Sequence, residues 1–177
     1  MTNQVELLIL DIDGVLTDGT KLYGLDGLPY SKKYCDKDFT AIKRFRGAGV
    51  SVCFLSGDEK VNLNMAKNRN IPFYSARGKD KKDFIDIICD DFSVSPDNMV
   101  YVGDDLFDIS IIKNVGYKFC PSDSCRDVKK ICGARGILTA RGGHNVVAEL
   151  FDTLLDLNLI TDCTMKDIEN LDKQEVF

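Results

Sequence analysis

The sequence predicts an α/β protein built on a doubly wound parallel sheet. Residues 5–10, 50–55 and 99–102 are short, nearly uninterrupted apolar runs, which is typical of central parallel strands. Segments with helical periodicity separate them, as in successive strand–helix–strand units. An aspartate follows the first run directly and another follows the third run after one glycine, at the strand ends where open α/β sheets bind ligands. The first and third runs therefore place a candidate site at one edge of the sheet.

The segment after the first strand is predicted to be a β-hairpin. Residues 19–34 alternate imperfectly in polarity around a turn signal at residues 24–27. Pro29 cannot donate to a strand ladder, so its arm is expected at an edge or in a projecting flap. Asp38 is expected to cap the helix that follows, which ends near Gly47.

The rest of the chain continues the alternation of strands and helices. The expected elements are a strand at 50–55, a helix ending near 68, a strand at 71–74, a helix at 83–92, a strand at 99–102, a helix, a strand at 116–120, a helix ending near 132 and a last helix at 145–159. These elements and the flap form one predicted unit over residues 1–160. The polar residues 161–177 are expected to be a mobile carboxyl-terminal tail.

Composition excludes several classes of partner. The 23 basic and 28 acidic residues give a net charge of −5, which argues against nucleic acid or a membrane surface as the main partner. The amino end lacks a basic region followed by an apolar segment, so we expect a soluble, cytoplasmic protein. The 7 cysteines include no CxxC pair, and reduced thiols are therefore expected.

The two aspartate clusters predict a divalent cation. Asp11 and Asp13 form one cluster, and Asp104, Asp105 and Asp108 form the other. Two carboxylates ~4 Å apart at an effective dielectric of ~20 repel by about 4 kcal/mol. A Mg²⁺ ion held by two or three of these oxygens would remove that repulsion and still bind water and a phosphate. The alternative for Asp105 and Asp108 is that they cap the next helix.

Asp11 and Asp13 suit the two halves of a phosphate-transfer reaction. With the phosphate charge neutralised, the carboxylate of Asp11 can attack phosphorus as a nucleophile. Asp13 can protonate the leaving oxygen and later activate water. The Ser56 hydroxyl and the backbone N–H of Gly57 could hold a phosphate oxygen, although a simple helix cap explains Ser56 as well.

A run of lysines precedes the helix expected at 83–92. One of Lys79, Lys81 and Lys82 could neutralise the phosphate, and such a run is otherwise a solvated face. The chemistry of the residues does not choose among the three.

The motifs resemble those of the haloacid dehalogenase (HAD) superfamily of aspartyl-phosphate phosphatases. Residues 11–18 resemble its first motif, Ser56 its second and residues 103–108 its fourth. The flap and residues 141–143 are similar to a subgroup that acts on 3-deoxy-2-ulosonate phosphates, such as 3-deoxy-manno-octulosonate (KDO) 8-phosphate. The resemblance covers roughly residues 5 to 158. The short intervals between the motifs leave no room for a large cap domain on the Rossmann-like core.

The resemblance implies a role for each matched residue. Asp11 becomes the nucleophile and a Mg²⁺ ligand, Asp13 becomes the acid/base and offers its backbone carbonyl to the metal, and Asp104 becomes the third protein ligand. Asp105 and Asp108 become supporting residues.

The resemblance also implies which lysine neutralises the phosphate and how the subunits assemble. The subgroup's lysine stands four residues after a glycine, and counting from Gly78 selects Lys82. The subgroup assembles as a homotetramer in which the flap and the carboxyl-terminal segment help to close the adjacent active site.

Three residues are candidate contacts to the sugar acid. Asp58 stands where the subgroup often has arginine, and it suits a hydroxyl or amine of the substrate. Arg141 can grip a carboxylate with two parallel hydrogen bonds. His144, the single histidine, is the third candidate. The chain departs from the subgroup at Asp58, at His144-Asn145, where a glycine is common, and at Phe39, where a glycine often follows the aspartate matching Asp38. These departures leave a nine-carbon, sialic-acid-like phosphate beside KDO 8-phosphate as a candidate substrate.

Two alternatives use the same residues. The first is phosphotransfer or sugar-phosphate mutation, which needs a cap that this chain lacks. The second is a phosphoacceptor or non-catalytic regulatory module associated with sugar activation. Receiver-like modules also cluster acids at strand ends, but they lack an acid/base at the position of Asp13.

Overall fold

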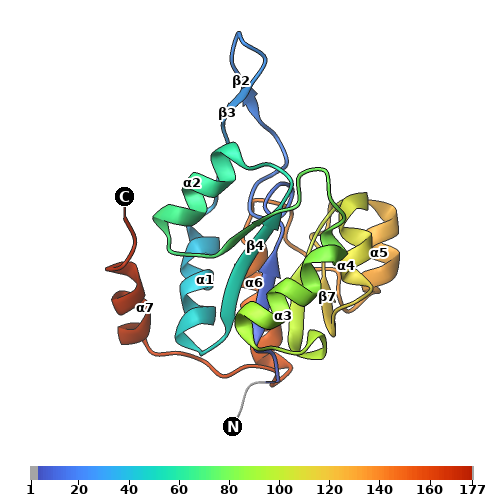
Figure 1. Cartoon of the computed structure of the whole chain (residues 1–177). Helices are drawn as coiled ribbons and strands as arrows, with labels where there is room; N and C mark the ends of the chain where they lie inside the picture. The colour runs from blue at the N-terminus through green and yellow to red at the C-terminus, as the bar shows by residue number, and fades with distance from the viewer. Residues whose placement is uncertain (1–3, 177) are drawn as a thin grey trace.

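The computed structural model describes residues 4–176 and contains a five-stranded parallel sheet and a separate two-stranded hairpin (Figure 1). The strands are β1 (Leu7–Leu10), β2 (Leu22–Tyr23), β3 (Pro29–Ser31), β4 (Ser51–Ser56), β5 (Phe73–Ser75), β6 (Met99–Val102) and β7 (Tyr117–Phe119). The α-helices are α1 (Asp36–Gly47), α2 (Lys60–Asn68), α3 (Ile85–Phe92), α4 (Ile109–Ile112), α5 (Arg126–Cys132), α6 (Val146–Asp156) and α7 (Met165–Asp172). The predicted α/β class is confirmed.

Helices cover both faces of the sheet because the central strands are apolar on both sides. Leu8 and Leu10 of β1 pack in one core with α1, α2 and α6, whereas Leu7 and Ile9 pack in a second core with α3, α4 and α5. All four residues are fully buried. This explains why the run is continuous rather than alternating.

The strand order places the two aspartate clusters side by side. The sheet runs β5-β4-β1-β6-β7, with every neighbouring pair parallel. Successive strands proceed outward from β1 through β4 to β5, and the chain then crosses to β6 on the other side of β1. A ligand crevice forms where the strand order reverses in this way. Asp11 follows β1 and Asp104 follows β6 at that point.

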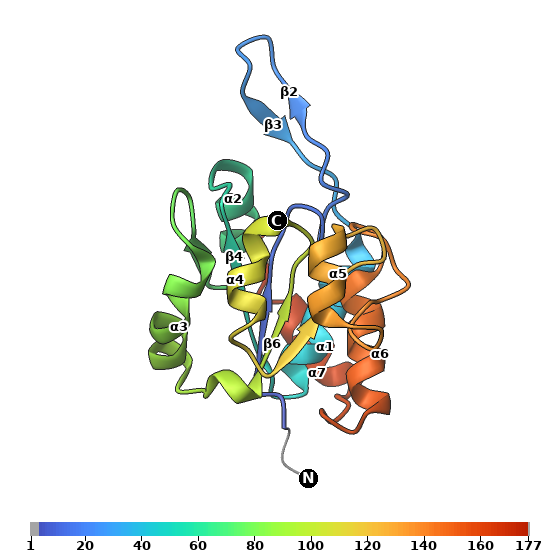
Figure 2. The same cartoon turned by 90° about the vertical axis from the view of Figure 1, so that its right-hand side faces the viewer.

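The predicted flap is a hairpin that projects beyond the rest of the fold (Figure 2). β2 and β3 pair antiparallel with an irregular register at Leu22 and Tyr23. Pro29 begins β3, where its missing N–H is tolerated. The prediction of a projecting arm at this proline is confirmed.

Asp38 caps a different helix from the one predicted. The residue before α1 is Cys35, and Asp38 lies in the first turn of α1. Its Oδ1 accepts hydrogen bonds from the backbone N–H groups of Val147 (2.8 Å) and Ala148 (3.2 Å) at the start of α6. The expectation was wrong because the free N–H groups at a helix start can be satisfied by any nearby carboxylate, including one from a neighbouring helix.

Part of the segment expected to be a mobile tail forms the helix α7. α7 begins with a capping box between Thr164 and Asp167 and packs against α1. Lys43 of α1 pairs with Asp172 and, at 3.0 Å, with Glu175. The polar composition of this segment gave no sign of these charged contacts. Residues 1–3 and 177 of the expected segments lie outside the described residues.

Most other boundaries differ from expectation by a few residues. The strand expected at 71–74 is β5 at Phe73–Ser75, and the helix expected at 83–92 is α3 preceded by a 3₁₀ turn, Lys81–Phe84. None of the helices in residues 4–176 is both long enough and apolar enough to cross a bilayer.

Candidate active site

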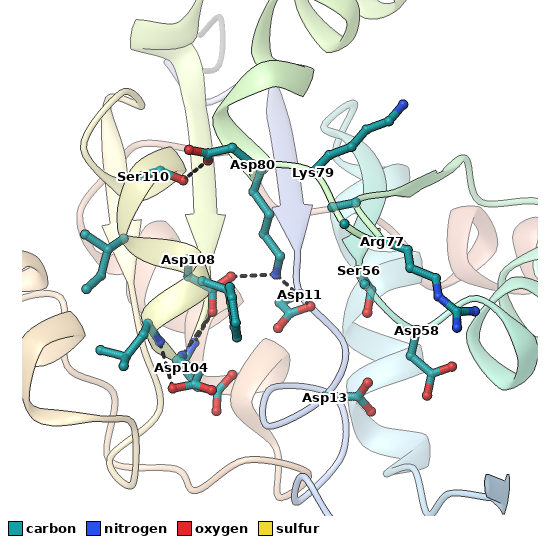
Figure 3. Close-up of a pocket in the computed structure, with 18 of the residues that line it drawn as sticks. Asp11, Asp13, Ser56, Asp58, Arg77, Lys79, Asp80, Asp104, Asp108 and Ser110 are labelled. Atoms are coloured by element: carbon teal, nitrogen blue, oxygen red, sulfur yellow. Dashed lines mark hydrogen bonds and ion pairs between the residues drawn. The ribbon is translucent and has the colours of Figure 1, made fainter. Parts of the chain in front are cut away.

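A cavity of about 1060 Å³ opens at the carboxyl ends of β1, β4 and β6 (Figure 3). Both aspartate clusters contribute to its lining through Asp11, Asp13 and Asp104. Ser56, at the end of β4, and Asp58, in the loop after β4, also line it. The sheet topology thus brings together residues that are far apart in the sequence.

Asp11 lies in a buried cluster of charged and phenolic groups. Lys81 Nζ lies 3.0 Å from Asp11 Oδ1 and 2.6 Å from Asp108 Oδ1. The Tyr101 hydroxyl donates to Asp108 Oδ1 at 2.6 Å and accepts from Lys81 at 3.1 Å. Burial alone would lower the pKa of Lys81, but Asp11 and Asp108 raise it above its usual range. Lys81 therefore stays charged and holds the Asp11 carboxylate in place.

Lys81, and not Lys82, is the lysine of this site. Lys82 has an exposed side chain (54 %) and pairs with Asp80 at 3.7 Å. Asp80 caps the 3₁₀ turn by accepting from the Lys82 N–H, and this turn directs Lys81 into the cavity. Counting four residues from Gly78 chose the wrong neighbour because a one-residue difference in a tight turn reverses which side chain points inward.

Asp108 organises the loop that carries Asp104. Its Oδ2 accepts hydrogen bonds from the backbone N–H groups of Asp104 (2.9 Å) and Asp105 (3.0 Å). A Cβ on Gly103 would lie 2.4 Å from Asp108 Cγ, so glycine is required there. Asp105 caps the short turn through Leu106 N. Capping thus explains Asp105, while Asp108 both caps the loop and anchors Lys81.

The arrangement suits a divalent cation. Asp11, Asp104 and Asp108 each offer a carboxylate oxygen within 4.8 Å of the others. Both oxygens of Asp108 already accept hydrogen bonds. Asp104 Oδ1, in contrast, is buried and accepts none from the residues that the structure describes. Asp11 and Asp104 are therefore the side chains that fit a metal, while the Asp13 carboxylate lies outside this cluster.

The protonation of the two candidate ligands supports the same conclusion. Burial, and to a smaller degree the neighbouring Asp108, raises the pKa of Asp11 to about 7, with Lys81 opposing the shift. Burial and the charges of Asp11 and Asp108 raise the pKa of Asp104 to about 8. Gly14 permits this crowding, because a Cβ at that position would lie 2.1 Å from Asp104 Oδ2. A bound cation would favour both ionised carboxylates.

Asp13 lies on the flap side of the cavity. Lys32 Nζ is 2.7 Å from Asp13 Oδ1 and 2.8 Å from Asp58 Oδ2. Lys21 Nζ is 2.9 Å from Asp58 Oδ2 and 3.5 Å from Asp13 Oδ2. Sequence reasoning missed both lysines, since neither belongs to a motif. The only sign of them in the sequence was that the predicted hairpin carries lysines whereas the predicted site is acidic.

Ser56 ends β4 with its hydroxyl directed into the fold. It is buried, and its Oγ accepts a hydrogen bond from Asn62 Nδ2 at 3.1 Å. The residue before α2 is Glu59, so Ser56 is not the cap of that helix. Gly57 follows in the cavity lining. Whether these groups bind phosphate stays a prediction.

Of the three predicted substrate contacts, only Asp58 lines this cavity. The Arg141 side chain is 74 % exposed and pairs with Asp123 at 3.2 Å. His144 Nδ1 lies 2.8 Å from the Gly142 carbonyl oxygen, and the ring lines a second, smaller depression. Within one chain, Arg141 and His144 therefore lie outside the lining of the cavity that holds Asp11, Asp13 and Asp104.

Gly142 and Gly143 instead pack against the backbone of residues 11–18, the loop that carries Asp11 and Asp13. A Cβ on Gly142 would lie 2.2 Å from the carbonyl oxygen of Gly14. The Gly143 N–H donates to the Val15 carbonyl at 2.8 Å. The Gly-Gly pair thus serves close backbone packing beneath residues 11–18.

Known proteins with similar sequences are phosphatases. No family model matches the chain. It is 29 % identical over 153 residues to 3-deoxy-D-manno-octulosonate 8-phosphate phosphatase KdsC of Salmonella typhi, covering 85 % of this chain and 79 % of that protein. It is 26 % identical to the enzyme of the same name from Haemophilus influenzae, covering 85 % and 83 %. The resemblance to the HAD phosphatases is confirmed.

Solved structures agree with the sequence comparison. The cobalt-bound KDO 8-phosphate phosphatase of Haemophilus influenzae aligns with a TM-score of 0.80 and 27 % identity, covering 88 % of this chain and 90 % of that one. The Moraxella catarrhalis phosphatase in complex with magnesium, phosphate and KDO has the same fold, with a TM-score of 0.78 and 21 % identity, covering 97 % and 91 %. The chain therefore has the same fold as these phosphatases over most of its length.

Proposed function

We propose that this chain is a Mg²⁺-dependent phosphatase that hydrolyses a 3-deoxy-2-ulosonate phosphate through an aspartyl-phosphate. The observation that carries this proposal is the convergence of Asp11, Lys81 and Asp104 at the strand ends, with Asp13 across the same cavity. The similar phosphatases named above supply the class of reaction. The geometry of the site and the similar phosphatases both support the hydrolysis of a phosphate monoester.

The first half of the reaction forms the covalent intermediate. A carboxylate oxygen of Asp11 attacks phosphorus, and the bond from phosphorus to the sugar oxygen breaks. Asp13 acts as the general acid and gives a proton to that leaving oxygen. Lys81 fixes the Asp11 carboxylate at 3.0 Å so that its other oxygen is presented to the cavity.

The second half releases phosphate. The Asp13 carboxylate takes a proton from a water molecule, whose oxygen attacks phosphorus. The bond between phosphorus and Asp11 then breaks, and both aspartates return to their starting states. Ser56 and Gly57 would hold a phosphate oxygen during both steps.

Asp11 and Asp104, with the backbone carbonyl of Asp13, would hold the metal. When bound, Mg²⁺ supplies positive charge that offsets the phosphate and keeps the two carboxylates ionised. The raised pKa values of these carboxylates and the unpartnered Asp104 oxygen support a cation at this point.

Two observations support the proposed substrate class. KDO 8-phosphate is the substrate in the names of the similar enzymes. Asp58 introduces a negative charge into the lining, and Lys21 accompanies it from the flap. A nine-carbon, sialic-acid-like ulosonate phosphate, with more hydroxyl and amine groups, suits this polar pair and is the second candidate.

Substitution of the nucleophile tests the function. Asp11→Asn should lower phosphate release from KDO 8-phosphate and from nine-carbon ulosonate phosphates by roughly 10⁴-fold or more, with folding retained. Asp90→Asn, at an exposed carboxylate on α3, is the matched control and should leave turnover unchanged. Unaltered turnover in Asp11→Asn would contradict the mechanism. A long-lived phosphoprotein that releases little phosphate would instead favour the signalling-module alternative.

We also propose that the protein acts as a homotetramer in the cytoplasm. The flap is a two-stranded hairpin, which is marginally stable on its own. Large apolar or aromatic side chains are exposed along it, namely Leu22, Tyr23, Leu25, Leu28 and Tyr30. Burial of these side chains against a neighbouring copy would stabilise the flap. Light scattering should give the mass of a tetramer, and a fully active monomer would contradict the shared arrangement.

A further inference from the structure

Lys32 is the most completely buried charged group of the flap. Its side chain has 0 % exposure, although it directly follows the edge strand β3. Its Nζ contacts Asp13 Oδ1 (2.7 Å) and Oδ2 (3.0 Å), Asp58 Oδ2 (2.8 Å) and Asn62 Oδ1 (2.8 Å). Burial of an ammonium is costly unless such partners surround it. The position of Lys32 is therefore specified by the active site rather than by the hairpin.

Asn62 extends this contact from Lys32 to Ser56. It is buried on α2, where its Oδ1 accepts from Lys32 and, at 3.1 Å, from the Tyr34 hydroxyl. Its Nδ2 donates to Ser56 Oγ at 3.1 Å. Because the amide oxygen faces two donors, the amide nitrogen is left to face the serine. A continuous chain of contacts thus runs from Asp13 through Lys32 and Asn62 to Ser56.

We propose that Lys32 is a positioning residue that fixes the Asp13 carboxyl for proton transfer and couples it to Ser56 through Asn62. This inference rests on the proposed role of Asp13 as the acid/base. An ammonium that touches both oxygens of one carboxyl group restricts its rotation about χ2. The Asp13 carboxyl is then presented to the leaving oxygen in one direction.

The neighbouring lysine provides an internal comparison. Lys33 follows directly in the chain, yet its side chain is exposed. Two adjacent lysines therefore differ in whether they face the active site. This difference supplies a matched control with the same charge change one residue away.

The test uses esters whose leaving groups differ. Phenyl phosphate has a poor leaving group that needs the proton of Asp13, whereas p-nitrophenyl phosphate has a good leaving group that needs it little. Lys32→Met should lower kcat/KM for phenyl phosphate by roughly 10- to 100-fold and for p-nitrophenyl phosphate by less than about threefold. Lys33→Met should leave both values unchanged. Equal losses on the two esters, or the same pattern in Lys33→Met, would overturn the proposal.

Two more variants separate positioning from folding. Lys32→Gln keeps a hydrogen-bond donor and should show the same imbalance in milder form, which gives a result even if Lys32→Met does not fold. Asn62→Ala should raise KM for both esters alike, because it loosens Ser56 and leaves the charge of Lys32 in place. An Asn62→Ala protein with unchanged KM would contradict the coupling. A wild-type protein inactive on every phosphate ester would refute the phosphatase itself, a result distinct from either of these.

Discussion

The two sides of the cavity hold their aspartates in different ways. On the sheet side, Asp11 is held by Lys81, whose other partners are Asp108 and Tyr101, and all of these groups are buried between β1, β6 and the 3₁₀ turn. On the flap side, Asp13 is held by lysines from a hairpin that projects from the fold (Figure 2).

This difference indicates that the nucleophile and the acid/base depend on different parts of the protein. Strands in the centre of a sheet are among the most stable elements of a fold, whereas a two-stranded hairpin opens more easily. Changes in the flap should therefore act on proton transfer first, and changes beside β1 should act on the whole site. The following experiments test that separation, beginning with the largest effect.

The strongest test removes the lysine on the sheet side. Lys81→Met leaves Asp11 and Asp108 buried without their cation, so the free energy of unfolding should fall by about 3 kcal/mol. Turnover should fall by roughly 100- to 1000-fold because the nucleophile is no longer held. Lys82→Met is the control and should change the unfolding free energy by less than about 0.5 kcal/mol. Equal effects of the two substitutions, measured by denaturation and phosphate release, would show that the buried position is unimportant.

The second test uses pH and the metal. Asp11 and Asp104 have folded-state pKa values of about 7 and about 8, above the ordinary aspartate value of 3.8. Between the ordinary value of 3.8 and these raised values, the folded metal-free protein binds more protons than the unfolded chain. Its free energy of unfolding should therefore fall as pH rises through this range. With chelator present, the Tm should be lower at about pH 7.5 than at about pH 5.5, and Mg²⁺ should reduce this difference. Asp104→Asn should flatten the pH dependence, whereas a Tm that rises with pH would contradict the assigned shifts.

The smallest effect is expected for the more exposed flap lysine. The Lys21 side chain is 23 % exposed and shares Asp58 with the fully buried Lys32. Lys21→Met should change the unfolding free energy by less than about 1 kcal/mol, as for other partly solvated ion pairs. It should also leave the ratio of phenyl to p-nitrophenyl phosphate hydrolysis near that of the wild type. A change as large as that of Lys32→Met would show that burial does not distinguish the two lysines.

The central strands and the two aspartate clusters were predictable from the sequence because their signals are local. A strand buried on both faces must be continuously apolar, and β6 matches its predicted range at residues 99–102. The order of strands and helices was predictable for the same reason. The proximity of Asp11 and Asp104 followed from parallel strands whose ends share one edge of the sheet.

The errors have a common physical cause. Asp38 was assigned to the wrong helix, Lys82 was chosen instead of Lys81, and the contact of α7 with α1 was not expected. In each case a charged side chain has its partner in a segment distant in sequence. Its local pattern resembles that of any solvated residue, so the sequence around it carries no signal.

The sequence by itself determined the α/β class, the flap and the aspartates that follow β1 and β6, because apolar runs, turn residues and short motifs act over a few neighbouring residues. Only the tertiary structure decided which lysine faces Asp11, that Lys32 and Asn62 join Asp13 to Ser56, and that Arg141 lies away from the cavity. The physical reason is that burial of a charge depends on partners brought together by the whole fold.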